Sequence, residues 1–152
     1  MHWGDSALNR KAGVTAQLSS YSVVGSGSVL KYSNDLRPMS WSDGTPTVSS
    51  ANNMNGVYIT GIGQGFSMSA PADTSTRTVT VHVGGWNSGG TLTAQLSDGS
   101  AANYTDTTTA SGQFDRNYVL TYNAASAGQT LTITWKMVSG TGNVTFNGAA
   151  LQ

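Results

Sequence analysis

The chain has 152 residues with seven basic and seven acidic side chains, so its formal net charge is zero. Charged residues make up 9% of the sequence, against about 25% in an average soluble domain, and neither Glu nor Cys occurs. This composition excludes disulfides and thiolate metal sites, and the scattered basic residues argue against nucleic acid or an anionic membrane as a partner.

The length suits one domain with one hydrophobic core, so we expect residues 1–152 to form a single domain. No run of about 18 apolar residues predicts a membrane span, and the first residues lack a signal-peptide pattern. The start at Met1-His2-Trp3 indicates a piece of a longer protein, with neighbouring domains covalently linked to it. We expect the domain itself to be a monomer.

Alternation of apolar and polar residues predicts β-strands through most of the chain. Helix is expected for a turn or two at most, near Asp5–Arg10. The predicted strands, in chain order, are Val14–Val23, 28–32, 39–42, 46–50, Val57–Thr60, Phe66–Ala70, Thr78–Val83, Leu92–Leu96, Tyr118–Tyr122, Thr130–Met137 and Val144–Leu151.

Asp-Gly and Asn-Gly pairs tolerate the positive φ angles of tight turns, and they occur at Asp43, Asn55, Asp98 and Asn147. Many short strands with frequent turn signals predict antiparallel sheets in a sandwich or a barrel. We expect an all-β, antiparallel two-sheet β-sandwich of the jelly-roll kind, with a barrel as the alternative.

The sequence contains few candidate catalytic residues. Glycoside hydrolysis needs two positioned carboxyl groups, and nucleophilic catalysis usually needs a base beside Ser or Cys. The acids are all Asp, and Asp43 and Asp98 stand in turn contexts. We therefore expect no enzymatic activity and no cofactor.

The two histidines do not suggest a metal site. His82 alternates with core valines and should point outward, while His2 lies at a terminus that we expect to be mobile. The Asp residues are too far apart in sequence to define a calcium loop, so a structural calcium ion stays open and unassigned.

The four tryptophans differ in their sequence context. Trp135 is in phase with Leu131 and Ile133 and should lie in the core. Trp86 lies between Gly84-Gly85 and Gly89-Gly90, which predicts a glycine-rich loop carrying an exposed ring or a lid over one end of the sandwich. Trp41 and Trp3 allow the same two interpretations.

An exposed aromatic ring can stack on the flat C–H face of a sugar, while nearby polar groups bond to the hydroxyls. A neutral polysaccharide needs few charges for recognition, which matches this composition. The candidate ligand-binding residues are Trp86, Trp41, Asn87, Asp43, Tyr58, Tyr104 and Arg116.

Segments along nearly the whole chain resemble a domain of large secreted bacterial proteins that often lies beside fibronectin-like or glycoside-degrading domains. They are His2-Trp3-Gly4, 11–14, 42–47, 56–58, 71–74, 96–100 and 125–130. The resemblance implies a jelly-roll, galactose-binding-like or carbohydrate-binding-module-like accessory domain, secreted or at the cell surface. It implies no particular ligand residues.

Two functions follow from this sequence. The first is a non-catalytic carbohydrate-binding module that targets a secreted enzyme or adhesin to a neutral polysaccharide or oligosaccharide. The alternative is a structural or adhesive spacer of a cell-surface protein, in which loop tryptophans only close the ends of the sandwich. An enzyme would require two close Asp residues in a cleft.

Overall fold

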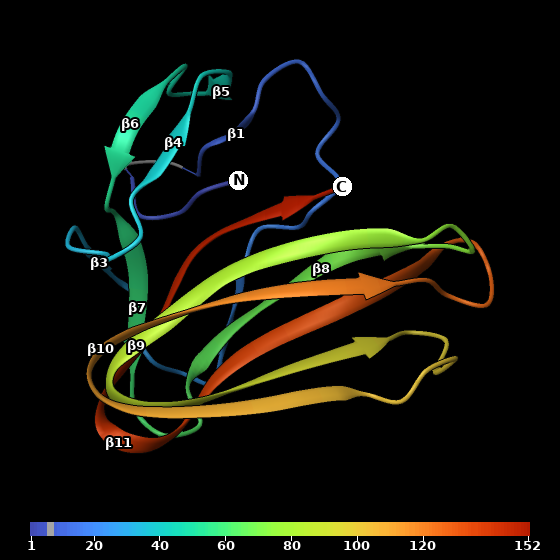
Figure 1. Ribbon diagram of the computed structural model, residues 1–152. Helices are drawn as coiled ribbons and strands as arrows, with labels where there is room; N and C mark the ends of the chain where they lie inside the picture. The colour runs from blue at the N-terminus through green and yellow to red at the C-terminus, as the bar shows by residue number, and fades with distance from the viewer. Residues whose placement is uncertain (6–7) are drawn as a thin grey trace.

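The structure consists of β-strands joined by turns and irregular segments (Figure 1). The computed structural model describes residues 1–5 and 8–152, and within these residues no helix forms. The strands are β1 (Arg10–Lys11), β2 (Ser22–Val24), β3 (Leu30–Tyr32), β4 (Met39–Trp41), β5 (Gly44–Thr45), β6 (Ser50–Asn53), β7 (Gly56–Thr60), β8 (Gly65–Ala72), β9 (Arg77–Leu96), β10 (Tyr104–Tyr122) and β11 (Gln129–Leu151).

All of the strand pairings are antiparallel, which confirms the predicted all-β, antiparallel class. The largest sheet has seven strands in the order β10-β9-β11-β7-β3, with β8 pairing β11 and β2 pairing β8. Two small sheets, β1-β5 and β4-β6, lie beside it.

The three longest strands bend at one common place. In Figure 1, β9, β10 and β11 each cross the molecule, curl at the same side and turn back. Both partners of β9 shift register opposite Asn87, between Ala110 and Gln113 on β10 and between Gly140 and Asn143 on β11. Asn87 has a φ of 46° and accepts a hydrogen bond at Oδ1 from the Gly112 amide (2.6 Å). Extra residues on both flanks give β9 the room to bend.

Glycines allow the bent strands to pack closely. A Cβ on Gly90 would collide with the Trp135 ring, and one on Gly142 would collide with the Trp86 carbonyl. The prediction of a loop at residues 84–90 is therefore wrong: these glycines belong to the middle of β9. In a strand, glycine marks a bend or a close backbone approach as readily as a loop.

The core lies between the strands and follows the predicted alternation. Val79, Val81 and Val83 are fully buried, as are Ile133 and Trp135. Trp135 also donates from Nε1 to the Gly84 carbonyl (3.0 Å).

Trp3 is buried, with its ring centroid 4.5 Å from that of Phe146. Trp3 therefore belongs to the core and does not offer an exposed ring.

Several predicted local elements differ from the structure. Most of Val14–Val23 is irregular and only β2, which starts at Ser22, is a strand; residues 46–49 are likewise irregular before β6. The expected helical turn near Asp5–Arg10 includes residues 6–7, outside the described residues, and Arg10 begins β1. The Asn147-Gly148 pair lies inside β11, at a register shift, rather than in a turn.

The N-terminal segment is tied to the rest of the fold, contrary to the mobility expected of His2. His2 is buried, exchanges two backbone hydrogen bonds with Asn9 (2.9 and 3.0 Å) and donates from Nε2 to the Asn55 carbonyl (2.9 Å). Short strands held by such contacts escape a search based on periodicity alone. A membrane-crossing helix, long and apolar enough to span a bilayer, is not found in the residues described.

Candidate functional site

A small pocket of about 240 Å³ opens where the long strands bend. We call it the Trp86 pocket. Its lining comes from the end of β3 and the residues after it, from β7, and from the bend of β9, β10 and β11: Tyr32, Asn34, Tyr58, Gly85, Trp86, Gln113, Asn143 and Thr145.

Strand register explains why these side chains meet. Trp86 on β9 lies directly opposite Gln113 on β10 and Asn143 on β11, so the three side chains form one row on one face of the sheet. Two residues further along β11, Thr145 lies opposite Tyr58 on β7 and brings that tyrosine to the same face. An indole is thus set between two amide side chains.

The Trp86 side chain is exposed although it stands in regular structure. Its residue keeps 50% of its surface accessible, whereas Trp3 and Trp135 keep 3% and 0%. A large aromatic ring left half in water beside a pocket is a common sign of a binding surface. The exposed face of the Trp86 ring can therefore pack against a ligand.

The polar groups of the pocket include acceptors that the protein leaves unused. Gln113 donates from Nε2 to the Asn34 carbonyl (2.8 Å), which fixes the amide and leaves its Oε1 as an acceptor. Within the described part of the chain, Asn143 Oδ1 is buried and accepts no hydrogen bond. Unsatisfied buried polar atoms are rare in native folds and often mark a place where a ligand or water completes the bonding.

A buried polar network holds the wall formed by Tyr32 and Asn34. Asp35 is 3% exposed and accepts hydrogen bonds from the Tyr32 hydroxyl (2.6 Å), the Asn147 amide (2.7 Å) and the Arg37 backbone (2.8 Å). Burial and the bond to Asp35 raise the pKa of Tyr32 well above its usual value, so its hydroxyl stays protonated. The wall is therefore pre-organised.

The pocket lining carries no charged side chain among the described residues. The nearby carboxylates Asp35 and Asp115 lie 3.4 and 3.3 Å from the Arg37 guanidinium, which pairs with both. No three His, Asp or Glu side chains gather to hold a metal ion anywhere in residues 1–5 and 8–152. The chemistry that the pocket offers is aromatic stacking with neutral hydrogen bonding.

The candidate residues from the sequence fall in four places. Trp86 and Tyr58 share the Trp86 pocket, and Asn87 lies next to it but uses its side chain to hold the bend. Trp41 and Asp43 line a separate cleft of about 480 Å³ beneath the small sheets, which we call the N-terminal cleft. Its lining is Met1, His2, Asn9–Lys11, Arg37–Trp41, Asp43, Gly44, His82, Asn117, Ala149 and Ala150.

The other two candidates lie elsewhere. Tyr104, which is 45% exposed, borders a third groove that is lined by residues from both ends of β10. Arg116 lies over the Phe114 ring, 5.8 Å from its centroid, and donates to Thr108 Oγ1 (3.2 Å).

Five pocket residues were missed by sequence reasoning: Tyr32, Asn34, Gln113, Asn143 and Thr145. Gln113 and Asn143 become visible only once the register with Trp86 is known. The pairing joins residues 27 and 57 positions away from Trp86, and no local pattern reports it. Among these five residues, Tyr32 had a recognisable feature in the sequence, because it is an aromatic residue in a short predicted strand.

Comparison of sequences gives no relative: no protein-family model matches this chain, and no curated protein matches it. Comparison of structures does give matches. TmCBM61, solved with β-1,4-galactotriose, is 14% identical with a TM-score of 0.50 and covers 88% of each chain. The CBM22-1–GH10 modules of a Clostridium thermocellum xylanase, solved with xylohexaose, are 8% identical with a TM-score of 0.51 over 95% of this chain.

A cyclase from Fischerella sp. TAU, in complex with an indole ketone, is similar to the same degree: 13% identity, a TM-score of 0.53, and 93% and 90% of the two chains. This chain spans 28% of the xylanase chain and 19% of a matched bacteriophage tailspike chain. At these identities the matches establish shared fold only. The chain has the all-β fold found in carbohydrate-binding modules.

Proposed function

We propose that this protein is a non-catalytic carbohydrate-binding domain and that the Trp86 pocket holds one neutral sugar unit of an oligosaccharide or polysaccharide. The observation that carries the proposal is the half-exposed Trp86 indole set between the Gln113 and Asn143 amides. The face of a pyranose ring packs on an indole, and its hydroxyls match fixed amide groups.

The fold supports this proposal without deciding it. We interpret the fold as a jelly-roll sandwich, an interpretation that the bend in β9, β10 and β11 supports. Two of the similar structures contain carbohydrate-binding modules and were solved with oligosaccharides. The cyclase has a comparable fold, so the pocket chemistry has to carry the functional argument.

The groups in reach of the pocket support a role in binding rather than catalysis. Hydrolysis of a glycoside uses two carboxyl groups on either side of the bond. Asp35 is buried and bonded to three partners, and Asp115 pairs with Arg37. Neither carboxylate lines the pocket among the described residues. We propose that the domain acts as an accessory unit of a secreted or cell-surface enzyme or adhesin.

Affinity electrophoresis through gels that contain soluble polysaccharides tests the proposal. The panel should include galactan and xylan, whose oligosaccharides occupy two of the similar structures. We expect retardation in at least one neutral gel and loss of that retardation in Trp86→Ala. The matched control is Tyr104→Ala, because it removes another half-exposed aromatic ring far along β10 and should leave mobility unchanged.

Stability must be measured on the same variants. Trp86→Ala should change the free energy of unfolding by no more than about 0.5 kcal/mol, as surface substitutions usually do. Uniform mobility across a broad neutral panel would reject carbohydrate binding and favour the structural spacer. A large loss of stability in Trp86→Ala would assign the ring to the fold instead.

A further inference from the structure

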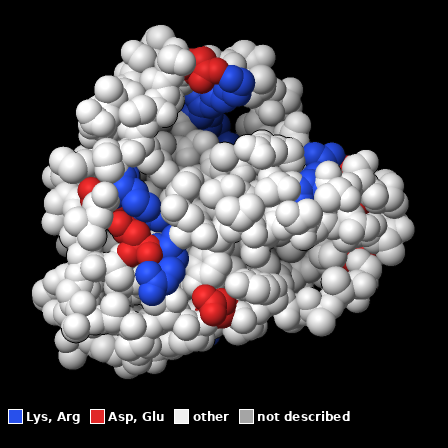
Figure 2. Space-filling view, viewed as in Figure 1, with Lys and Arg blue, Asp and Glu red and all other residues white. Residues whose placement is uncertain are grey.

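The N-terminal cleft differs in chemistry from the Trp86 pocket. Figure 2 shows a mostly uncharged surface, with Lys and Arg gathered at a hollow near the top of the view. The charged side chains lining the N-terminal cleft are Arg10, Lys11, Arg37 and Asp43. The side-chain charges of the cleft lining are therefore mainly positive, whereas the Trp86 pocket has none.

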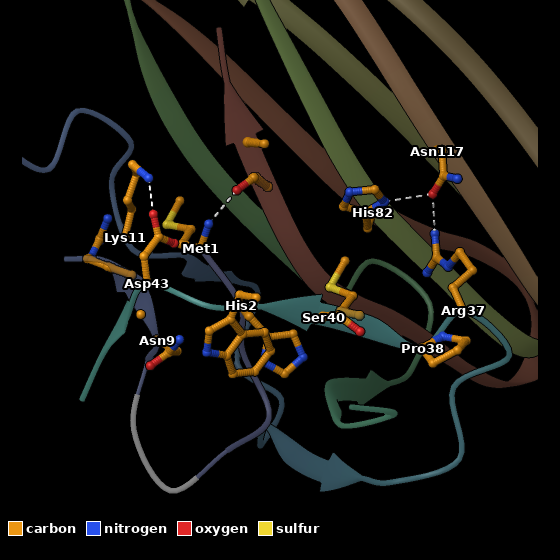
Figure 3. Close-up of a pocket in the computed structure, with 16 residues that line it drawn as sticks. Met1, His2, Asn9, Lys11, Arg37, Pro38, Ser40, Asp43, His82 and Asn117 are labelled. Carbon is orange, nitrogen blue, oxygen red and sulfur yellow. Dashed lines mark hydrogen bonds and ion pairs between the residues drawn. The ribbon is translucent and has the colours of Figure 1, made fainter. Parts of the chain in front are cut away.

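These positive charges are not equally available to a ligand. Arg37 is fully engaged, because its guanidinium pairs with Asp35 and Asp115 and donates to Asn117 Oδ1 (2.7 Å). Lys11 forms an exposed ion pair with Asp43 at the mouth of the cleft (Figure 3). Exposed pairs of this kind contribute little and exchange partners readily.

Arg10 is the cation with spare bonding capacity. It donates from Nη1 to the Leu18 carbonyl (2.9 Å), and among the residues described no carboxylate lies within ion-pair distance of it. The guanidinium keeps further N–H donors in a fixed fork, the geometry that binds a carboxylate with two parallel hydrogen bonds.

The cleft also offers an aromatic surface and an acceptor for a hydroxyl. Trp41 is half-buried, held by the bond from Nε1 to the Thr47 carbonyl (3.0 Å) and by the His2 ring at a centroid distance of 5.2 Å. His82 Nδ1 lies 2.8 Å from Asn117 Oδ1, which already accepts from Arg37, so Nδ1 carries the proton. This leaves Nε2 as the acceptor on the side of the ring that lines the cleft (Figure 3).

We propose that the N-terminal cleft is a second ligand site, which binds a carboxylate-bearing saccharide of the uronic acid class through Arg10 and Lys11, with Trp41 and His82 contacting the sugar ring and hydroxyls. The cleft volume of about 480 Å³ is twice that of the Trp86 pocket and accommodates a larger ligand. The site shares no lining residue with the neutral pocket, which lies at the bend of the long strands.

Titration calorimetry with matched disaccharides tests the proposal. The probes are digalacturonate, a mannuronate disaccharide and a glucuronate disaccharide, with galactobiose as the neutral counterpart of the first and acetate as a carboxylate without a sugar ring. We expect at least one uronate disaccharide to bind more tightly than both galactobiose and acetate. We also expect its affinity to fall as salt rises, because the contact is an ion pair at a partly exposed site.

Variants separate this site from the Trp86 pocket. Arg10→Gln should weaken uronate binding about tenfold or more, as loss of a charge-assisted bond does. Arg10→Lys should retain part of the affinity, because it keeps the charge without the fork. Trp86→Ala, the matched control, should leave uronate binding unchanged even if it abolishes neutral-sugar binding.

Three results would overturn the proposal. They are no binding of any uronate disaccharide at about 10 mM, equal binding of galactobiose or acetate, and uronate binding by the unmodified protein that is independent of salt. If Arg10→Gln does not fold, the salt dependence and the Arg10→Lys variant still decide. Uronate binding lost in Trp86→Ala but retained in Arg10→Gln would place the ligand in the other pocket.

Discussion

The Trp86 pocket and the N-terminal cleft are built in opposite ways. The pocket lies on the three longest strands, where register alone sets Gln113, Trp86 and Asn143 in a row. The cleft lies between the short strands β1, β4 and β5 and the long strands β9, β10 and β11. Its short strands are held by bonds between side chains and backbone, such as the one from the Thr47 amide to Asn9 Oδ1 (2.9 Å). The lining of the Trp86 pocket is uncharged, whereas the lining of the cleft contains charged side chains and both histidines.

The largest effect is expected where the two regions are connected. Asp35 supports Tyr32 in the pocket wall and Arg37 in the cleft lining, so Asp35→Ala should disturb both. It removes one partner of a buried ion pair, and we expect a loss of about 3–5 kcal/mol in the free energy of unfolding. Urea titration measures the loss. The loss in free energy of unfolding should be smaller in Asp35→Asn. If Asp35→Ala were as stable as the unmodified protein, Asp35 would not connect the two regions.

A substitution of Gly90, near the bend, should lower stability more than a substitution of a glycine in an open turn. Gly90→Ala places a methyl group against the buried Trp135 ring, and overpacking of this kind costs about 1–3 kcal/mol. Gly128→Asn is the control, since Gly128 has a φ of 75° that Asn tolerates and no atom within 4 Å of a Cβ. Thermal unfolding compares the two variants. A neutral Gly90→Ala would mean that close packing does not hold the bend.

Alkaline pH should weaken the fold on the side of the long strands. Burial, together with a hydrogen bond to Asp106, raises the pKa of Tyr118 to about 12, and burial also raises the pKa of Tyr32. The unfolded chain ionises these groups near pH 10, so their contribution is complete below that pH and is lost as the pH rises toward the folded values. Tyr118→Phe should flatten the decrease measured by urea unfolding between about pH 10 and 12.

Mild acid should act on the cleft side, with the smallest effect. Burial lowers the pKa of His82, opposed by its bond to Asn117. The unfolded state then binds a proton more readily, so stability is complete above about pH 6.5 and decreases as the pH falls through the folded value. His82→Asn should remove this slope between about pH 7 and 5. An unchanged slope would assign the acid sensitivity to other groups.

Much of the fold was readable because alternation reports one buried face of a strand. Val79, Val81, Val83 and Trp135 were placed correctly in the core. The loop predicted at Gly84–Gly90 was wrong, because a glycine cluster is typical of a bend in a strand as well as of a loop. The site was only partly readable: Trp86 was chosen for its surroundings, whereas Gln113 and Asn143 reach it through pairings between distant residues.

The pairing of β9 on both sides of the bend has a consequence for how the molecule opens. β9 is hydrogen-bonded to β10 on one side and β11 on the other, before and after the bend. Because both halves of β9 belong to one continuous backbone, one half cannot separate from its neighbouring strands without pulling on the other half. Amide protons along β9 should therefore exchange with solvent together, in a rare global opening, while those of β1, β4, β5 and β6 exchange through frequent local openings. The bend that exposes Trp86 would then be among the slowest-exchanging parts of the chain.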